Sequence, residues 1–463
     1  MQMPLRNLAW PLRLCAACTA CAVQVPFTYA TPTYAQAPTA QQATASTPSA
    51  APSDQPPRAA PSAQLLRDDR ALAAWVIAHS PDIGAARAES AQTRAAALGS
   101  RLLPNPTVDI SVGNFALGET NPAGYSRGKT LLYGVGVSEL FELGKRSPRI
   151  EAADLHKRAA EGRLTATVAD RVAFARFTLA QLVYARSRAQ ELDASLVEAR
   201  SATDVAKGRL DHQALSGVDY DRLMIDLVGI ETESAHAHAD AEAALAQCAA
   251  TLYAPCDDAD TSVASLEPAA NIPAGYEPAQ LGKRADIRAL QFESAANRRE
   301  ADLAAARAIP DLTFRLGYAH DTFTVSGSLA NSLSLSVSAP LPLFDHGQHD
   351  KSAALARAKQ YSELARGSLA KARGDVTALF TRKRALEGAL ERLQQDALPR
   401  ANGVLEAEER GLREGQLDIT DLLLVRREAI ALRLQTLELR FELFNLRNQL
   451  RQALGLDEAL AQR

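Results

Sequence analysis

Hydrophobic residues alternate with small or polar residues in four short segments of the chain. Residues 107–112 and 133–138 form one pair of such segments, and residues 312–318 and 332–338 form another. In each segment the apolar side chains recur at every second position, whereas serine, threonine, glycine and aspartate occupy most of the positions between. A period of two predicts β-strands with one apolar and one polar face.

Long helical patterns follow each pair of predicted strands. Residues 148–209 contain no proline after Pro148 and only two glycines, which predicts a helix of about 60 residues, or roughly 90 Å. The chain reverses at residues 211–217, and a second helix is predicted for residues 218–253. Within the first helix, apolar residues from Val168 to Leu182 step by four and three, a spacing typical of coiled coils.

The same order of elements is predicted twice. A helical run ends at Pro104 and a second ends at Pro310, and each is followed by two strands and a helical hairpin. In the second copy the helices are residues 351–413 and a return helix, joined by a turn at residues 414–417. The pattern predicts a first repeat at residues 65–253 and a second at 284–456, and a supersecondary unit used twice predicts a pseudo-symmetric architecture. Residues 254–283 would connect the repeats, and 457–463 would be a C-terminal tail.

The N-terminal part of the chain has the composition of an export signal. Residues 1–30 combine arginines, a short apolar core and a small-residue cleavage site, Thr28-Tyr29-Ala30. Residues 31–64 are mostly rich in Pro, Ser, Ala, Thr and Gln, which predicts a disordered or extended segment. Lipidation at Cys18 or Cys21 is an alternative, although neither has the leucine three positions upstream that such sites usually carry.

Two cysteines, Cys248 and Cys256, remain after the predicted signal. In an exported protein such a pair is either joined by a disulfide or present as two separate thiols.

Composition narrows the possible functions. The 51 basic and 54 acidic residues nearly balance, which argues against a nucleic-acid partner. No phosphate-binding glycine loop, nucleophile elbow or His-Glu-x-x-His motif occurs, so we expect no enzyme and no cofactor. His346 and His349 have acidic neighbours, but we interpret them as part of a polar elbow rather than as metal ligands.

Four strands per chain are too few to close a barrel, which needs at least about eight. The strands therefore form either a soluble sheet or a barrel to which several chains contribute. A trimer would supply twelve strands, with apolar faces toward lipid and polar faces toward a lumen.

Four motifs in this order resemble the outer-membrane efflux proteins, the TolC-type outer-membrane factors. They are Leu103-Pro104-Asn105-Pro106, Glu139 to Arg146 (ELFELGKR), Ala339 to Gly347 (APLPLFDHG) and Gly415 to Leu423 (GQLDITDLL). The resemblance extends over residues 65–456. The second and third motifs are most similar to the branch that serves cobalt, zinc and cadmium efflux.

The resemblance implies a mainly α-helical protein with a membrane β-barrel portion. Its homotrimer would form a 12-stranded barrel in outer-membrane lipid, continued by a coiled-coil tunnel through the periplasm. It would conduct substrate passively from a periplasmic adaptor and a resistance-nodulation-division type pump of the inner membrane. Alternatives are a channel for drug efflux or type I secretion, and a periplasmic coiled-coil adaptor or structural protein.

The resemblance also suggests roles for residues at the helical hairpins. Asp421 would belong to a ring of acids that closes the periplasmic end, and Asp219 is the matching residue of the first hairpin. A second acid of the family's gate falls on Leu424 in this chain. Asp418 is a candidate helix N-cap. The expected adaptor-docking residues are Asp211, His212, Gln213, Gly217, Glu414, Gly415, Gln416 and Leu417.

Overall fold

The computed structural model describes residues 59–115, 130–256, 263–266, 272, 278–323, 329–414 and 419–462. The chain divides into two compact units, residues 1–55 and 56–463, and every described residue belongs to the second. The predicted signal and most of the segment 31–64 lie outside the described residues.

The order of helix, two strands and two long helices occurs in both halves of this unit. The elements of the first half are α1 (Ser62–Arg67), α2 (Asp69–His79), α3 (Pro81–Gly99), β1 (Thr107–Gly113), β2 (Leu132–Phe141), α4 (Arg146–Asp211) and α5 (Gly217–Leu252). The elements of the second half are α6 (Ala285–Ala306), β3 (Leu312–Asp321), β4 (Asn331–Ser338), α7 (Gln348–Arg392), α8 (Leu398–Glu414) and α9 (Ile419–Ala453). Short 3-10 helices lie at Val263–Leu266, Pro278–Lys283 and Leu456–Gln462. All four predicted strands and all four predicted hairpin helices are present in the structure.

Local capping divides the helical run before Pro104 into three helices. Pro81 starts α3, because its missing N–H costs nothing in a first turn. An additional break occurs at Asp68, whose carboxylate accepts hydrogen bonds from the backbone N–H groups of Arg70 and Ala71. This N-cap begins α2 directly after α1.

The helix expected over residues 351–413 contains an interruption that periodicity did not predict. A π-helical turn, Leu393–Ala397, separates α7 from α8. Proline 399 follows at the second position of α8, and a proline within a helix removes one backbone hydrogen bond and crowds the preceding turn. The wider π turn just before it accommodates this local defect.

The four strands form one antiparallel sheet in the order β1-β2-β3-β4, so β1 and β4 lie at its edges. Thr107 pairs with Ser138, Ser138 with Arg315, and Thr313 with Ser338. The apolar residues share one face and are largely solvent-exposed: Ile110 is 80% exposed and Leu335 75%. The sheet therefore presents an uncovered apolar face.

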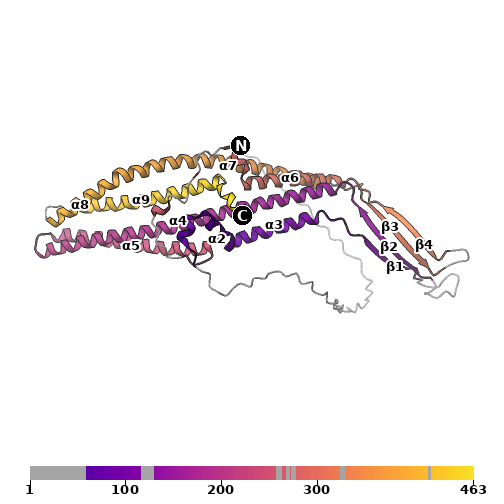
Figure 1. Ribbon diagram of the computed structural model, residues 1–463, viewed down its shortest axis with the longest axis horizontal. Helices are drawn as coiled ribbons and strands as arrows, with labels where there is room; N and C mark the ends of the chain where they lie inside the picture. The colour runs from indigo at the N-terminus through magenta and orange to yellow at the C-terminus, as the bar shows by residue number, and fades with distance from the viewer. Residues whose placement is uncertain are drawn as a thin grey trace, which may run out of the picture. The chain divides into compact units, whose positions relative to one another are not determined.

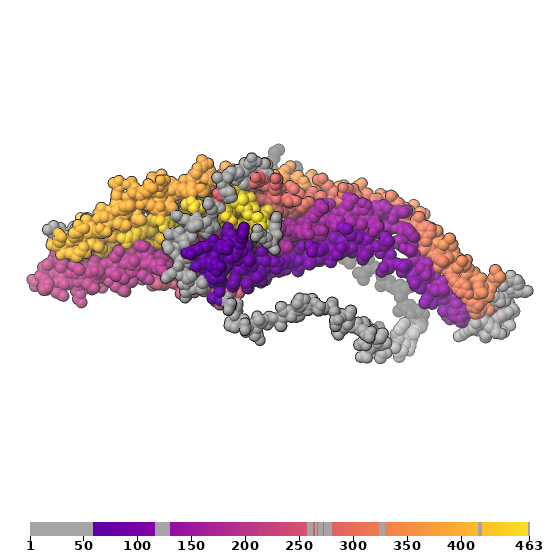
Figure 2. All heavy atoms as spheres, in the orientation of Figure 1, coloured from indigo at the N-terminus to yellow at the C-terminus, as the bar shows by residue number. Residues whose placement is uncertain are grey.

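The long helices pack side by side, with the sheet at one end of this unit and the turn between α4 and α5 at the other (Figures 1 and 2). Many of the residues buried along α4 are alanines, which allow neighbouring helices to approach closely. The largest apolar cluster joins α1, α2, α4, α5 and α9, and includes Leu72, Val172, Leu179 and Phe444. None of the described helices combines the length and the hydrophobicity needed to cross a membrane.

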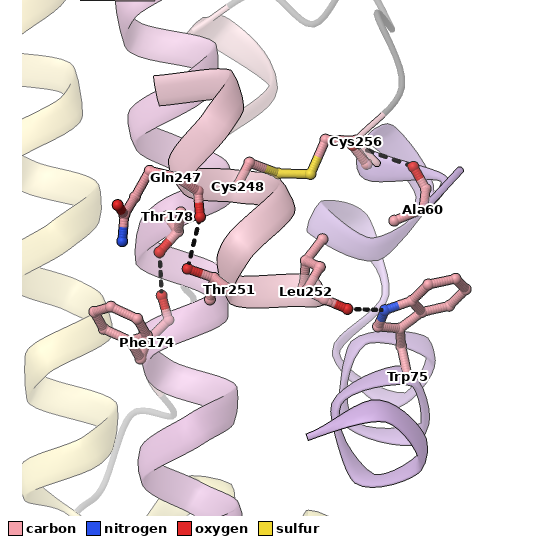
Figure 3. The surroundings of a disulfide bond; sticks show 10 residues. Ala60, Trp75, Phe174, Thr178, Gln247, Cys248, Thr251, Leu252 and Cys256 are labelled. Carbon is pink, nitrogen blue, oxygen red and sulfur yellow. Dashed lines mark hydrogen bonds between the residues drawn. A yellow bond between two sulfur atoms is a disulfide. The ribbon is translucent and has the colours of Figure 1, made fainter. Parts of the chain in front are cut away.

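A disulfide between Cys248 and Cys256 joins the last turns of α5 to the segment that follows it (Figure 3). Cys256 forms an isolated β-bridge with Ala60, and the Trp75 indole donates a hydrogen bond of 3.1 Å to the Leu252 carbonyl. The disulfide therefore also stabilises the contact between α5 and the residues around α1 and α2.

Candidate functional site at the hairpin ends

The first hairpin end is a short turn between α4 and α5. Asp211 is the last residue of α4, and the backbone N–H of His212 donates to the Gly208 carbonyl. Gln213 adopts a left-handed backbone conformation with φ of 58°, which reverses the chain. The side chains of these three residues are exposed, and Gly217 is the first residue of α5. All four predicted tip residues of this hairpin therefore lie at the surface of the described unit.

Asp219 is engaged in a capping arrangement at the start of α5. Its backbone N–H donates to Ser216 Oγ at 3.1 Å, and Ser216 Oγ donates to Asp219 Oδ2 at 2.7 Å. Arg222 also donates to Asp219, at 3.1 Å. The Asp219 carboxylate thus has both a hydrogen-bond donor and a counter-charge.

The second hairpin, unlike the first, is described only up to the end of α8 and again from the start of α9. Helix α8 ends at Glu414, whereas Gly415, Gln416, Leu417 and Asp418 lie outside the described residues, so their docking and N-cap roles stay predictions. Asp421 lies in the first turn of α9 and is exposed. Among the described residues no ion pair of Asp421 is found, in contrast to Asp219. Leu424, one turn further, is 58% exposed.

The two hairpin ends pack against each other. A cluster of buried residues that includes Ala206, Leu223, Leu412 and Leu422 joins α4, α5, α8 and α9. Arg222 donates to Thr420 Oγ1 at 3.3 Å, which connects the second turn of α5 to the first turn of α9. The two candidate gate acids therefore lie in helix starts that are linked to each other.

A buried charged group lies one to two turns further along α5 and α9. Asp226 and Arg426 are almost fully buried, and Arg426 Nη1 lies 3.8 Å from Asp226 Oδ2. Arg427 Nε donates to the other carboxylate oxygen of Asp226 at 2.8 Å. Burial lowers the pKa of Arg426 below its usual range, and the nearby carboxylates of Asp226, Glu409 and Glu198 only partly oppose this.

Sequence patterns did not indicate Arg222, Asp226 or Arg426. Each occurs in a helix with many other charged residues, where a charged side chain is normally solvated. Only the crossing of α5 with α9, about 200 residues apart in the chain, brings them together. Across the described ranges, no group of three or more His, Cys, Asp or Glu residues is arranged to hold a metal ion.

The match to a family model supports the assignment of the fold. Residues 279–456, which contain the second predicted repeat, match the model of the outer membrane efflux protein family. This match confirms the resemblance expected from the sequence. The proteins of that family are non-enzymatic transport proteins of the outer membrane. No curated protein sequence matches the chain.

Solved structures share the fold over most of the chain. The outer-membrane channel OprN has 20% identity and a TM-score of 0.70, and the match covers 85% of this chain and 91% of that one. CusC, whose structures concern folding and transmembrane channel formation, has 16% identity, a TM-score of 0.72, and coverage of 88% and 99%. The outer-membrane protein VceC of Vibrio cholerae has 18% identity, a TM-score of 0.70, and coverage of 85% and 96%. At these identities the likeness shows the fold.

Proposed function

We propose that the protein is the outer-membrane channel of a tripartite efflux system and acts as a homotrimer. The observation that carries this proposal is the four-stranded sheet, whose apolar face is exposed and whose edge strands are unpaired within the described residues. In lipid an open sheet edge leaves backbone groups without partners, whereas three copies would supply twelve strands and close the sheet into a barrel. The apolar faces would then contact outer-membrane lipid and the polar faces would line a lumen.

The helices would continue this barrel as a periplasmic tunnel. Helix α4 has 66 residues, which corresponds to about 100 Å at 1.5 Å per residue. The hairpin ends lie at the opposite end of the unit from the sheet (Figure 1), where a periplasmic adaptor and an inner-membrane pump of the resistance-nodulation-division type would approach.

The assembly is tested by extraction of the protein from an outer-membrane fraction. We expect a band of trimer mass in unheated detergent gels and a monomer band after boiling. A monomer recovered from the soluble periplasm would contradict the channel and would favour a coiled-coil adaptor or structural protein.

The predicted tip residues of the two hairpins are the proposed docking surface for the adaptor. Cysteines introduced by Gln213→Cys and Gln416→Cys are expected to cross-link to the adaptor in whole cells. The native pair, Cys248 and Cys256, is bonded and does not compete. A cysteine in the sheet, Ser334→Cys, is the negative control, and equal yields at the sheet and the tips would contradict docking.

Asp421 is the proposed gate residue. Three such carboxylates near the axis of a trimer would attract cations and repel anions. Asp219 is the weaker partner, because Arg222 already neutralises it. We expect Asp421→Ala to raise the single-channel conductance of the isolated trimer more than Asp219→Ala does. Unchanged conductance and cation selectivity in Asp421→Ala would refute the gate role.

The proposed substrates are heavy-metal cations such as cobalt, zinc and cadmium. This choice is supported by two motifs, Phe141 to Arg146 and Leu343 to Gly347, which resemble the cobalt, zinc and cadmium branch of the family. A strain that lacks the protein is expected to become sensitive to these metals, and the gene restored in trans is expected to reverse the effect. Sensitivity to drugs without sensitivity to metals would support drug efflux instead.

A further inference from the structure

On the polar face of the sheet, side chains of one strand lie over glycines of the next. Ser111 of β1 lies over Gly134 of β2, and Ser334 of β4 lies over Gly317 of β3. At each of these glycines an added Cβ would contact the neighbouring side chain. The small residues therefore let longer side chains lie along the sheet surface instead of standing upright on it.

The largest side chain arranged in this way is that of Arg315. In the register of the sheet Asp109 pairs with Gly136, and Arg315 pairs with Ser138 on the other side of β2. From there the guanidinium crosses diagonally over Gly136, so that a Cβ at this glycine would lie 2.9 Å from Arg315 Nε and 3.1 Å from Nη2. Arg315 Nη2 ends 3.7 Å from Asp109 Oδ2.

Arg315 and Asp109 both lie on the face that alternates with the apolar residues. Their cross-strand neighbours on this face include Ser138, Ser336, Gly317 and Ser334, which are all small. Within the described strands this is the ion pair that joins β1 to β3 across β2. In a barrel it would repeat once in every chain.

We propose that Gly136 and Asp109 position Arg315 against the wall of the pore, and that this arrangement sets the charge selectivity of the barrel. This inference rests on the proposed channel function. Held flat and paired with Asp109, the guanidinium does not present a net positive charge to a passing cation. Lifted away from the wall and from Asp109, three such guanidinium groups would form a positive ring that repels cations.

The substitution that tests this arrangement leaves the fold intact. The atoms that a Cβ at Gly136 would meet belong to the end of a flexible side chain, so the arginine can move without displacing the backbone. Gly136→Ala therefore lifts Arg315 without removing any charge. Gly113 is on the same face at the end of β1, and a Cβ there would meet nothing within 4 Å, which makes Gly113→Ala the matched control.

The measurement is the ratio of potassium to chloride permeability of purified trimers in planar bilayers under a KCl gradient at low salt. All variants carry Asp421→Ala, so that the proposed gate contributes no charge. A unit charge about 10 Å from an ion in water changes the local ion concentration about twofold, so we expect Gly136→Ala to lower the ratio roughly twofold. Asp109→Asn is expected to act in the same direction.

Two controls identify the moved guanidinium as the cause. Gly113→Ala is expected to leave the permeability ratio unchanged. Adding Arg315→Gln to Gly136→Ala is expected to abolish the decrease in this ratio that Gly136→Ala causes. If Gly136→Ala conducts with the same selectivity as Gly113→Ala, the inference is wrong and the channel function stands. If trimers of the parent protein do not conduct at all, the proposed function fails, and the inference fails with it.

Discussion

Two arginines in this protein are equally buried but differ in their partners. Arg176 lies in the middle of α4 and is 0% exposed, and Arg426 lies near the hairpin ends in α9 and is 1% exposed. All three guanidinium nitrogens of Arg176 donate hydrogen bonds, to Asp69, Asn448 and Asp457. In contrast, Nε and Nη2 of Arg426 have no hydrogen-bond partner among the described residues.

The pKa values of the two arginines shift in opposite directions. Burial acts to lower the pKa of Arg176, but Asp457 and Asp69 outweigh it and raise the pKa above its ordinary value. At Arg426 burial dominates and the pKa falls. Burial alone therefore does not decide whether a charged group stabilises the fold; the number and distance of its partners do. We infer that the middle of the helical body is held more tightly than the hairpin ends.

The largest expected effect is that of Arg176→Met. The substitution leaves the carboxylates of Asp69 and Asp457 with Arg451 as the remaining cationic partner, so we expect a loss of about 3 kcal/mol or more. Thermal unfolding of the purified protein in detergent, followed by circular dichroism, measures it. Arg171 on the same helix pairs with Asp82 at the surface, so Arg171→Met is the control, with an expected loss of about 1 kcal/mol or less. Equal losses would remove the basis of the comparison.

The disulfide near the same region is expected to have the second largest effect. Cys248 and Cys256 are eight positions apart, and closing so short a loop stabilises the folded state by about 2–3 kcal/mol. We expect the double variant Cys248→Ala/Cys256→Ala to unfold at a lower temperature than the oxidised protein. Reductant should lower the unfolding temperature of the parent protein and leave the double variant unaffected. If reductant has no effect on the parent protein, the disulfide does not contribute to the stability of this region.

His156 is a third cationic group to compare with the two arginines. It is half-buried and has two carboxylate partners. Its ring nitrogens lie 2.9 Å from Glu293 and 3.0 Å from Glu300, which raise its pKa to about 9. Arg163 also donates to Glu293 at 2.6 Å, and Arg357 lies 3.6 Å from Glu300.

The pH dependence of this site follows from the direction of the shift. Because the folded-state pKa exceeds the usual value of 6.5, the stabilisation is complete below that pH and is lost as the pH rises to about 9. We expect the difference in unfolding temperature between the parent protein and His156→Gln to shrink over this interval. His79, whose ring is hydrogen-bonded to the Trp75 backbone carbonyl, provides the control His79→Gln. A difference that does not change with pH would show that the ion pairs of His156 do not stabilise the fold.

The strands and long helices could be predicted from the sequence because each follows from a pattern among residues close together in the chain. A period of two defines β1 to β4, and the absence of proline over 60 residues defines α4. The π turn at residues 393–397 was not predictable, since its cause is how the chain accommodates a single proline. Likewise, nothing local distinguishes Arg176 or Arg426 from the solvated arginines around them. Arg176 meets Asp457 281 residues away, and Asp226 meets Arg427 201 residues away, so only the packing of distant helices selects them.

The smallest expected effect is that of Arg426→Met. This variant removes a buried cation with two unpaired nitrogens, while Asp226 keeps its hydrogen bond to Arg427. We expect a stability within about 1 kcal/mol of the parent protein, or a gain, because a buried charge replaced by an apolar residue of similar size is often neutral or favourable. The same unfolding measurement applies.

The decisive control is the opposite partner, Asp226→Leu. It leaves Arg426 buried without its nearest counter-charge, so we expect it to destabilise the protein clearly more than Arg426→Met does. If Arg426→Met is as costly as Arg176→Met, the hairpin ends are held by charge as firmly as the middle of the helical body. The two regions would then differ in sequence but not in how tightly they are held.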